Sequence, residues 1–320
     1  MPKIVSTGFL TAMCLLAGVA VAQSYPSKSI RIIVPFPPGA FNDTLGRTIA
    51  QKFSDGGFGT AFVDNRPGAA STLGADIAAK SPADGYTLLI VAVPFAVNHT
   101  LYTRLPYDTL RDLTPVIYAG ASANILAVHP SVPVKTVRDL IELAKAKPGL
   151  LTYASAGSGT SPHMAMELLK LMTGVEMLHI PYKGGAPAVS DLIGGHVMMY
   201  CENLPNLLPH AQAGRLRAIA VTTAARIKQA PEIPTIAETV PGFEVVVWFG
   251  VVAPAATPRD IIVKLNAEIN RILTIPDVRE RFLNGAVDPV GGSPEQFGAH
   301  LKSEINKWAK VVKATGARVD

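Results

Sequence analysis

Short apolar runs rich in β-branched residues alternate along the chain with segments in which apolar residues recur at helical spacing. We expect strands at residues 30–34, 61–63, 87–91, 116–118, 125–128, 151–153, 177–180, 197–200, 218–221 and 245–252. We expect helices at residues 43–53, 73–79, 137–146, 163–172, 186–193, 260–273, 276–283 and 294–312. This alternation predicts an α/β protein with mainly parallel sheets flanked by helices.

The predicted strands are too numerous for one compact sheet, so two doubly wound lobes fit the pattern better. A boundary is expected near residues 120–124, and the apolar run 245–252 is expected to cross back between the lobes. The predicted division places residues 23–122 and 253–320 in one lobe, and residues 123–252, with the hinge crossing, in the other. The last three helices are then expected to pack on the first lobe.

The first 22 residues have the pattern of a cleavable signal peptide. A lysine precedes an apolar run at residues 9–21, and the small residues Ala20 and Ala22 suit cleavage after position 22. The run is shorter than a permanent membrane span. We therefore expect a soluble protein exported from the cytoplasm, in which Cys201 is the one remaining cysteine and no intramolecular disulfide forms.

The composition favours a packed globular protein and argues against nucleic-acid binding. Hydrophobic residues make up 48% of the chain and charged residues 17%, which allows a sizeable core. The net charge of +5 is scattered, unlike the basic patch of a nucleic-acid-binding protein. Because the seven histidines show no paired helical spacing and no clustered carboxylates, we predict no metal site. We also predict no cofactor.

The most informative segment is the turn at residues 35–43, which joins the first predicted strand to the first predicted helix. Prolines stiffen the turn, and Gly39 lets the backbone approach another group closely. Asp43 stands where an N-cap would accept a bond from the helix amides. The amides of residues 40–42 then point outward at the positive end of the helix dipole, which favours an anion. An ordinary capped strand–helix turn is the alternative interpretation.

Three further loops follow predicted strands, where ligands bind in α/β sheets. Residues 154–163 combine glycines with hydroxyl groups that suit a polar or anionic group. Residues 181–186 add the charge of Lys183 and further glycines at a helix start. Glu202 and Asn203 follow another strand, where they either meet a polar or amino group or cap the next helix.

Nine short segments, some of them in the loops described above, follow one another along the mature chain in the order seen in a known family. They are residues 35–43, 65–68, 84–89, 105–108, 181–184, 191–197, 216–222, 234–238 and 241–244. In this ordered set the chain resembles the Bug family, the TctC-like extracytoplasmic solute-binding receptors of tripartite tricarboxylate transporters. The resemblance implies a two-lobed periplasmic binding protein fold of the type II kind, with crossing hinge strands.

The resemblance also implies a function. A receptor of this family captures a small carboxylated solute between its lobes and delivers it to membrane permease subunits, and we expect it to act as a monomer and not as an enzyme. The ligand contacts implied by the resemblance and by the loops above are Phe36, Gly39, Ala40, Phe41, Asn42, Asp43, Ser155, Gly157, Ser158, Thr160, His163, Lys183, Gly184, Glu202 and Asn203.

Three positions depart from the usual pattern of the family. Ala40 stands in place of a second glycine, Glu202 stands where aspartate is common, and residues 68–71 lack glycines that are usual there. The identity of the ligand stays open among dicarboxylates, tricarboxylates, amino acids, aromatic acids and neutral analogues such as amides.

Two other functions are compatible with parts of the sequence. A receptor that engages a membrane kinase instead of a permease would share the fold. A secreted hydrolase would use Ser158 as nucleophile and His163 as base. The chain lacks a G-x-S-x-G elbow, however, and no acidic residue is evidently placed to orient His163.

Overall fold

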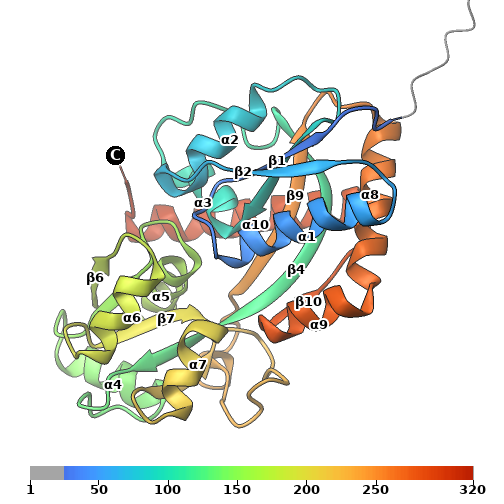
Figure 1. Ribbon diagram of the computed structural model, residues 1–320. Helices are drawn as coiled ribbons and strands as arrows, with labels where there is room; N and C mark the ends of the chain where they lie inside the picture. Colours follow the sequence, from blue (N-terminus) through green and yellow to red (C-terminus); the bar gives the residue numbers. More distant parts are fainter. Residues whose placement is uncertain (1–24, 320) are drawn as a thin grey trace, which may run out of the picture.

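The computed structural model describes residues 25–319 as an α/β molecule whose strands join in one sheet (Figure 1). The predicted signal peptide, residues 1–22, lies outside the described residues. The strands are β1 (Ile30–Val34), β2 (Ala61–Asn65), β3 (Thr87–Ala92), β4 (Leu113–Val128), β5 (Thr152–Ser155), β6 (Leu178–Pro181), β7 (Met199–Asn203), β8 (Arg217–Val221), β9 (Val246–Pro254) and β10 (Val287–Pro289). The helices are α1 (Phe41–Asp55), α2 (Thr72–Ala79), α3 (Val93–Leu101), α4 (Val137–Ala146), α5 (Ser161–Thr173), α6 (Gly185–Ile193), α7 (Leu204–Gln212), α8 (Arg259–Thr274), α9 (Pro276–Asn284) and α10 (Pro294–Thr315), with short 3₁₀ turns η1 (Ala69–Ser71) and η2 (Ile236–Glu238).

The sheet contains both parallel and antiparallel pairs. Its order is β2-β1-β3-β9-β4-β7-β5-β6, and β8 and β10 also pair with β4. The pairs within β1–β3 and within β5–β7 are parallel, as the alternation of strands and helices predicts. The pairs that include β4 or β9 are antiparallel. The sheet is therefore mixed, with a parallel block on each side of these two long strands.

Two lobes form around the parallel blocks (Figure 1). We call β1–β3 and β10 with α1–α3, α8 and α9 the first lobe, and β5–β8 with α4–α7 the second lobe. Strand β4 leads from the first lobe into the second, because it pairs with β9 along residues 113–123 and with β7 along residues 124–128. Strand β9 leads the chain back. The α/β class and the crossing strands are confirmed.

Strand β4 is one long strand where the sequence predicts two short ones. Residues 113–128 stay extended, including the small residues at 119–123 between the predicted strands. Small side chains lower strand propensity, but this stretch is hydrogen-bonded to β9 on one edge and to β10 on the other. The pairing overrides the weak local preference, so residues 120–124 form part of a continuous crossing strand.

Helices α3 and α7 and strand β10 are absent from the predicted set. Seven of the nine residues of α3 are buried, so the helix is apolar on nearly every side and shows little amphipathic period. Its Pro94 lies in the first turn, where the missing amide of proline costs no helical hydrogen bond. Strand β10 has three residues, too few for a sequence pattern.

Helix α10 crosses the junction of the lobes and contacts α3 in the first and α5 in the second (Figure 1). One apolar core surrounds it and includes Phe95 of α3, Leu169 of α5 and Trp308 of α10 itself. The indole nitrogens of Trp248 and Trp308 lie 2.9 and 2.8 Å from the same buried oxygen, Oε2 of Glu304. The last helix therefore ties the lobes together, where the sequence analysis placed it on the first lobe alone.

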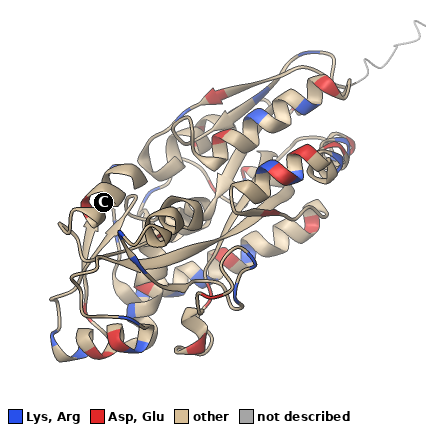
Figure 2. Ribbon diagram, turned by 60° about the horizontal axis from the view of Figure 1, so that its bottom comes forward, with Lys and Arg blue, Asp and Glu red and all other residues tan. Residues whose placement is uncertain are grey.

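Charged residues lie mostly on the outer helices, where acidic and basic side chains alternate, while the central strands carry few of them (Figure 2). This arrangement agrees with the scattered charge of the sequence and with a sheet buried between layers of helices. Among residues 25–319, no helix combines the length and the apolar character needed to cross a membrane.

Candidate functional site

A cavity of about 1200 Å³ lies between the two lobes, beside strand β9. The first lobe lines it with the β1–α1 turn, η1 and the start of α3, and the second lobe with the starts of α5, α6 and α7. These are the carboxyl ends of β1, β3, β5, β6 and β7, where α/β sheets place their ligands. A smaller cavity of about 580 Å³ lies on the first lobe among β4, α8 and α10, away from the glycine-rich loops.

The wall of the larger cavity is mostly apolar. Val247 and Phe249 of strand β9 contribute to it, together with prolines at positions 35, 37, 38, 67, 94, 162 and 187. Proline rings are rigid and lose little side-chain entropy on binding. The few polar groups at the ends of the cavity are therefore the ones that orient a ligand.

Helix α1 starts earlier than predicted, with Ala40 as its N-cap residue. The prediction that Asp43 is the N-cap is wrong, because Asp43 lies inside the first helical turn. Its Oδ2 accepts hydrogen bonds from the Gly39 amide at 3.1 Å and from Arg47 Nε at 2.9 Å, and its Oδ1 accepts one from Asn65 Nδ2 at 2.9 Å. The φ angle of Gly39 is 92°, which favours glycine at this position. Asp43 therefore holds the turn through these hydrogen bonds and does not line the cavity.

The ionisation of Asp43 follows from these contacts. Burial alone raises the pKa of Asp43, but hydrogen bonds from Arg47, Asn65 and the Gly39 amide, with the charge of Arg47, lower it overall. The carboxylate is consequently ionised at neutral pH. Its hydrogen bonds to the turn are present above the ordinary aspartate pKa of 3.8 and are lost as the pH falls through the lowered value.

The first turn of α1 leaves three amides without a protein partner. Within residues 25–319, the amides of Ala40, Phe41 and Asn42 donate to no other group. Ala40 and Asn42 line the cavity, and the buried Oδ1 of Asn42 has no partner among the described residues. The ring of Phe41 packs against Phe249 with centroids 4.5 Å apart, so this residue lies outside the cavity lining. The free amides sit at the positive end of a helix dipole, which suits a carboxylate.

Segment η1, on the same lobe as this turn, has a strained backbone. Ala69, Ala70 and Ser71 have φ angles of 45°, 48° and 75°, in the left-handed region that only glycine enters easily. The three residues line the cavity. Asn98 Nδ2 holds the segment by donating to the Ala70 carbonyl at 2.7 Å. The sequence analysis noted the missing glycines here but did not place these residues in the site.

Replacing Ala70 with glycine is expected to stabilise the protein by about 1 kcal/mol, because glycine adopts this backbone without a Cβ clash. Urea unfolding of the wild type and Ala70→Gly measures the change. Ala50→Gly in the interior of α1 is the matched control and is expected to destabilise by a similar amount. If Ala70→Gly and Ala50→Gly lower the free energy of unfolding equally, the backbone of η1 is not strained.

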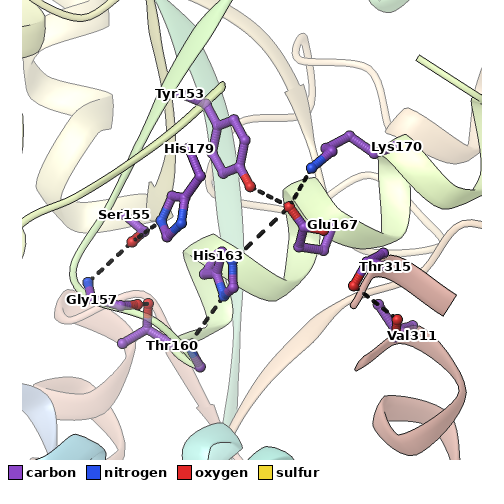
Figure 3. Close-up of polar contacts among 11 residues, drawn as sticks. Tyr153, Ser155, Gly157, Thr160, His163, Glu167, Lys170, His179, Val311 and Thr315 are labelled. Carbon is purple, nitrogen blue, oxygen red and sulfur yellow. Dashed lines mark hydrogen bonds and ion pairs between the residues drawn. The ribbon is translucent and has the colours of Figure 1, made fainter. Parts of the chain in front are cut away.

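The hydroxyl groups of Ser155 and Thr160 hold the loop between β5 and α5 through internal hydrogen bonds (Figure 3). Ser155 Oγ lies 2.7 Å from His179 Nε2 and accepts a hydrogen bond from the Gly157 amide at 3.1 Å. The Thr160 hydroxyl donates to the Gly157 carbonyl at 2.6 Å. Ser158 is half-buried and lies outside the cavity lining, whereas Thr160 is part of it.

Behind this loop lies a buried network of ionisable groups (Figure 3). The rings of His163 and His179 stack with centroids 4.1 Å apart, and His163 Nδ1 accepts a hydrogen bond from the Gly159 amide at 3.1 Å. Glu167 accepts hydrogen bonds from Lys170 Nζ at 2.7 Å and from the Tyr153 hydroxyl.

Burial sets the charge of this network. It lowers the pKa of His163 to about 4 and that of His179 to about 3, so both rings are neutral at neutral pH. Because His163 Nδ1 accepts the amide proton of Gly159, its own proton is on Nε2, which lies 4.0 Å from Glu167 Oε1. The expectation that no acidic residue orients His163 is wrong, since Glu167 follows it by one helical turn.

The same geometry bears on the hydrolase alternative. His163 Nδ1 is occupied by the Gly159 amide, its Nε2 faces Glu167, and no hydrogen bond joins the ring to Ser158 among the described contacts. A nucleophilic serine needs a base within hydrogen-bonding distance. The network therefore supports the loop and does not pair Ser158 with His163 as nucleophile and base.

The second lobe supplies most of the polar side chains at the far end of the cavity. Lys183 is exposed on the loop before α6, and Glu202 is buried at the end of β7. Asn206 and His210 of α7 also line this end, although the sequence analysis did not single them out. They lie one turn apart on the same helix, and this spacing was the signal that could have identified them.

The structure brings nine of the fifteen expected contact residues to the cavity wall. The nine are Phe36, Gly39, Ala40, Asn42, Thr160, Lys183, Gly184, Glu202 and Asn203. The remaining six lie outside the lining, and they are Phe41, Asp43, Ser155, Gly157, Ser158 and His163. Four of these six have polar partners that hold the loops in place. No group of three or more His, Cys, Asp or Glu side chains is arranged to hold a metal ion in the part of the chain that the structure describes.

Two α/β lobes joined by crossing strands, with a polar-ended cavity between them, define a solute-binding protein of the periplasmic class. The comparison with known families is specific: the profile of the TctC family, described as "Tripartite tricarboxylate transporter family receptor", matches residues 45–317. The chain belongs to this family.

Individual relatives agree with the family assignment. Protein BugT of Bordetella pertussis is 39% identical over 315 residues, which cover 98% of this chain and 97% of the relative. Among solved structures, R. palustris Rpa4515 with adipate has a TM-score of 0.83 and 39% identity, covering 91% of this chain and 98% of that one. MatC (Rpa3494) from Rhodopseudomonas palustris with bound malate has a TM-score of 0.80 and 28% identity, and the match covers 90% of this chain and 100% of that one.

Proposed function

We propose that this protein is a periplasmic receptor that captures a small carboxylated solute and delivers it to the membrane permease subunits of a tripartite tricarboxylate transporter. It binds as a monomer and without catalysis, after removal of residues 1–22. Its closing units are residues 23–122 with 253–320, and residues 123–252. The solute is held between them.

The observation that carries this proposal is the first turn of α1. Three adjacent amides without protein partners, at residues 40–42, lie at a helix N-terminus on the wall of an interlobe cavity. Two similar proteins with solved structures contain the dicarboxylates adipate and malate, which supports a carboxylate as the solute here. The family supports the delivery step, since its members are receptors of these transporters.

The physical mechanism is capture by closure. When the lobes close about β4 and β9, bulk water leaves the cavity, and amide bonds to a carboxylate act in a lower dielectric. Each charge-assisted hydrogen bond contributes about 1.5–3 kcal/mol net. Several such bonds, reduced by the cost of immobilising the solute, give about 8 kcal/mol, which corresponds to micromolar affinity.

A thermal-shift screen of the exported protein against carboxylates tests the proposal. A carboxylate present at a hundredfold its dissociation constant is expected to add about 2.7 kcal/mol to the free energy of unfolding, which raises the melting temperature by several degrees. The corresponding neutral amides are expected to give no shift, because they carry no charge for the helix N-terminus. Stabilisation by the amides as strong as that by the acids would contradict the proposal.

A further inference from the structure

The second-lobe end of the cavity contains a carboxylate of the protein itself. Glu202 is 3% exposed and lines the cavity. The Tyr200 hydroxyl donates to its Oε2, and the Asn203 amide donates to its Oε1 at 2.7 Å. Burial raises the pKa of Glu202, while hydrogen bonds from Tyr200, Asn203 and Asn206 oppose the rise. Its identified partners are donors, so the carboxyl oxygens act as acceptors.

Helix α6 begins beside this carboxyl group. A Cβ placed on Gly185, the first residue of α6, would lie 3.0 Å from Glu202 Oε2, and the helix has no side-chain N-cap bond. The positive end of the α6 dipole thus lies beside a carboxyl group of the protein itself. The starts of α1 and α6 consequently differ: that of α1 is free for an anion, whereas that of α6 is next to Glu202.

Asn203 adds a hydrogen-bond acceptor near Glu202, and His210 adds an imidazole nitrogen that accepts or donates according to its tautomer. Asn203 Oδ1 and His210 Nδ1 are buried, line the cavity and have no partner among residues 25–319. Burial, with the charge of Arg215, lowers the pKa of His210, so its ring is neutral at neutral pH. The lining holds one lysine, Lys183, and one carboxyl side chain, Glu202, which leaves the α1 amides to compensate one ligand carboxylate.

We propose that Glu202 makes this receptor selective for solutes with one carboxylate, an apolar body, and a far end that donates hydrogen bonds through a hydroxyl, amino or amide group. A second carboxylate at the far end would lie beside Glu202 and leave the acceptors of Asn203 unpaired. This inference rests on the proposed function, because it assumes that the first carboxylate binds at α1. It separates this chain from the adipate-containing and malate-containing relatives, whose solutes carry two carboxylates.

The test compares three series of solutes that share chain lengths and differ at one end. These are the α,ω-dicarboxylates, the ω-hydroxy acids and the ω-amino acids, titrated calorimetrically into the wild type, Glu202→Gln and the exposed control Glu176→Gln. The wild type and the control are expected to bind the best hydroxy or amino acid at least tenfold more tightly than the dicarboxylate of equal length. Glu202→Gln is expected to bind that dicarboxylate at least tenfold more tightly than the wild type does, and the amino acid more weakly.

The outcomes separate this inference from the proposed function. If a dicarboxylate binds the wild type most tightly, the selectivity assigned to Glu202 is wrong, while the carboxylate receptor stands. If no member of any series binds, the inference fails, while the thermal-shift screen of other carboxylates decides the proposed function. Should Glu202→Gln fold poorly, the ranking of the three series in the wild type alone still decides the matter.

Discussion

Asn42→Asp is expected to weaken carboxylate binding at least a hundredfold while leaving the fold intact. Asn42 is buried in the first turn of α1 and lines the cavity, next to the free amides of Ala40 and Phe41. Aspartate has nearly the same shape as asparagine but places a negative charge where the ligand carboxylate is expected. That charge repels the ligand and attracts the same amides. A hundredfold loss corresponds to about 2.7 kcal/mol.

Asn42→Asp is expected to change the stability of the ligand-free protein only slightly, in contrast to its large effect on binding. An acidic residue in the first turn of a helix is stabilising by about 0.3–1 kcal/mol, whereas the nearby Asp43 opposes a second negative charge. The free energy of unfolding without ligand should therefore stay within about 1 kcal/mol of the wild type. Calorimetric titration and urea unfolding measure the two quantities.

The exposed Asn284 offers a matched control for this experiment, because Asn284→Asp introduces the same charge outside the cavity lining. The control should bind like the wild type. Unchanged affinity in Asn42→Asp would mean that the anion is not held at the start of α1.

Glu167→Ala is expected to lower the free energy of unfolding by about 3 kcal/mol. Glu167 is buried, and its loss leaves the buried Tyr153 hydroxyl and the partly buried Lys170 ammonium without their acceptor. The network that holds the loop before α5 would lose its central carboxylate, so ligand affinity should fall as well. Urea unfolding of the wild type and the variant measures the loss.

The stabilisation by Glu167 has a defined pH dependence. Burial raises the pKa of Glu167, but hydrogen bonds from Lys170 and Tyr153, with the charges of Lys170 and His163, lower it overall. Because the folded-state pKa is depressed, the stabilisation is complete above the ordinary value of 4.5 and is lost as the pH falls through the lowered pKa. The difference between the wild type and Glu167→Ala should therefore shrink on acidification.

Two comparisons make the Glu167 prediction specific. Glu167→Gln keeps an acceptor for Tyr153 but loses the ion pair with Lys170, and should lose less stability than Glu167→Ala. Glu176→Ala, on an exposed residue, should change stability by less than about 0.5 kcal/mol. If Glu167→Ala unfolds at the same urea concentration as Glu176→Ala, the network does not stabilise the second lobe.

The sequence predicted strong periodic elements well and turn geometry less well. Strand β1 and helix α4 have the predicted bounds, because both have a clear apolar pattern and α4 has a capping box at Thr136. The predicted start of α1 was wrong because Asp43, four residues after Gly39 in a proline-rich turn, has the residue type of an N-cap. Whether Asp43 caps the helix or reaches back to Gly39 depends on backbone angles that residue types do not determine.

The site was predictable as a set of loops and less so as a set of side chains. Parallel strands bring their carboxyl ends together, so the turns at residues 35–43 and 181–186 were expected at one cavity. Which hydroxyl or imidazole faces that cavity depends on packing between distant segments. His163 stacks on His179, sixteen residues later in the chain, and lies outside the cavity lining.

The shared acceptor of the two indoles has a consequence for spectroscopy. Trp248 and Trp308 are the only tryptophans of the chain, and both donate to Glu304 where β9 meets α10. Trp248 itself lies outside the cavity lining, between Val247 and Phe249, which are part of it. Intrinsic fluorescence therefore reports from one place in the molecule. A change in emission on adding a solute would register movement of the crossing strand against the last helix rather than contact between solute and indole.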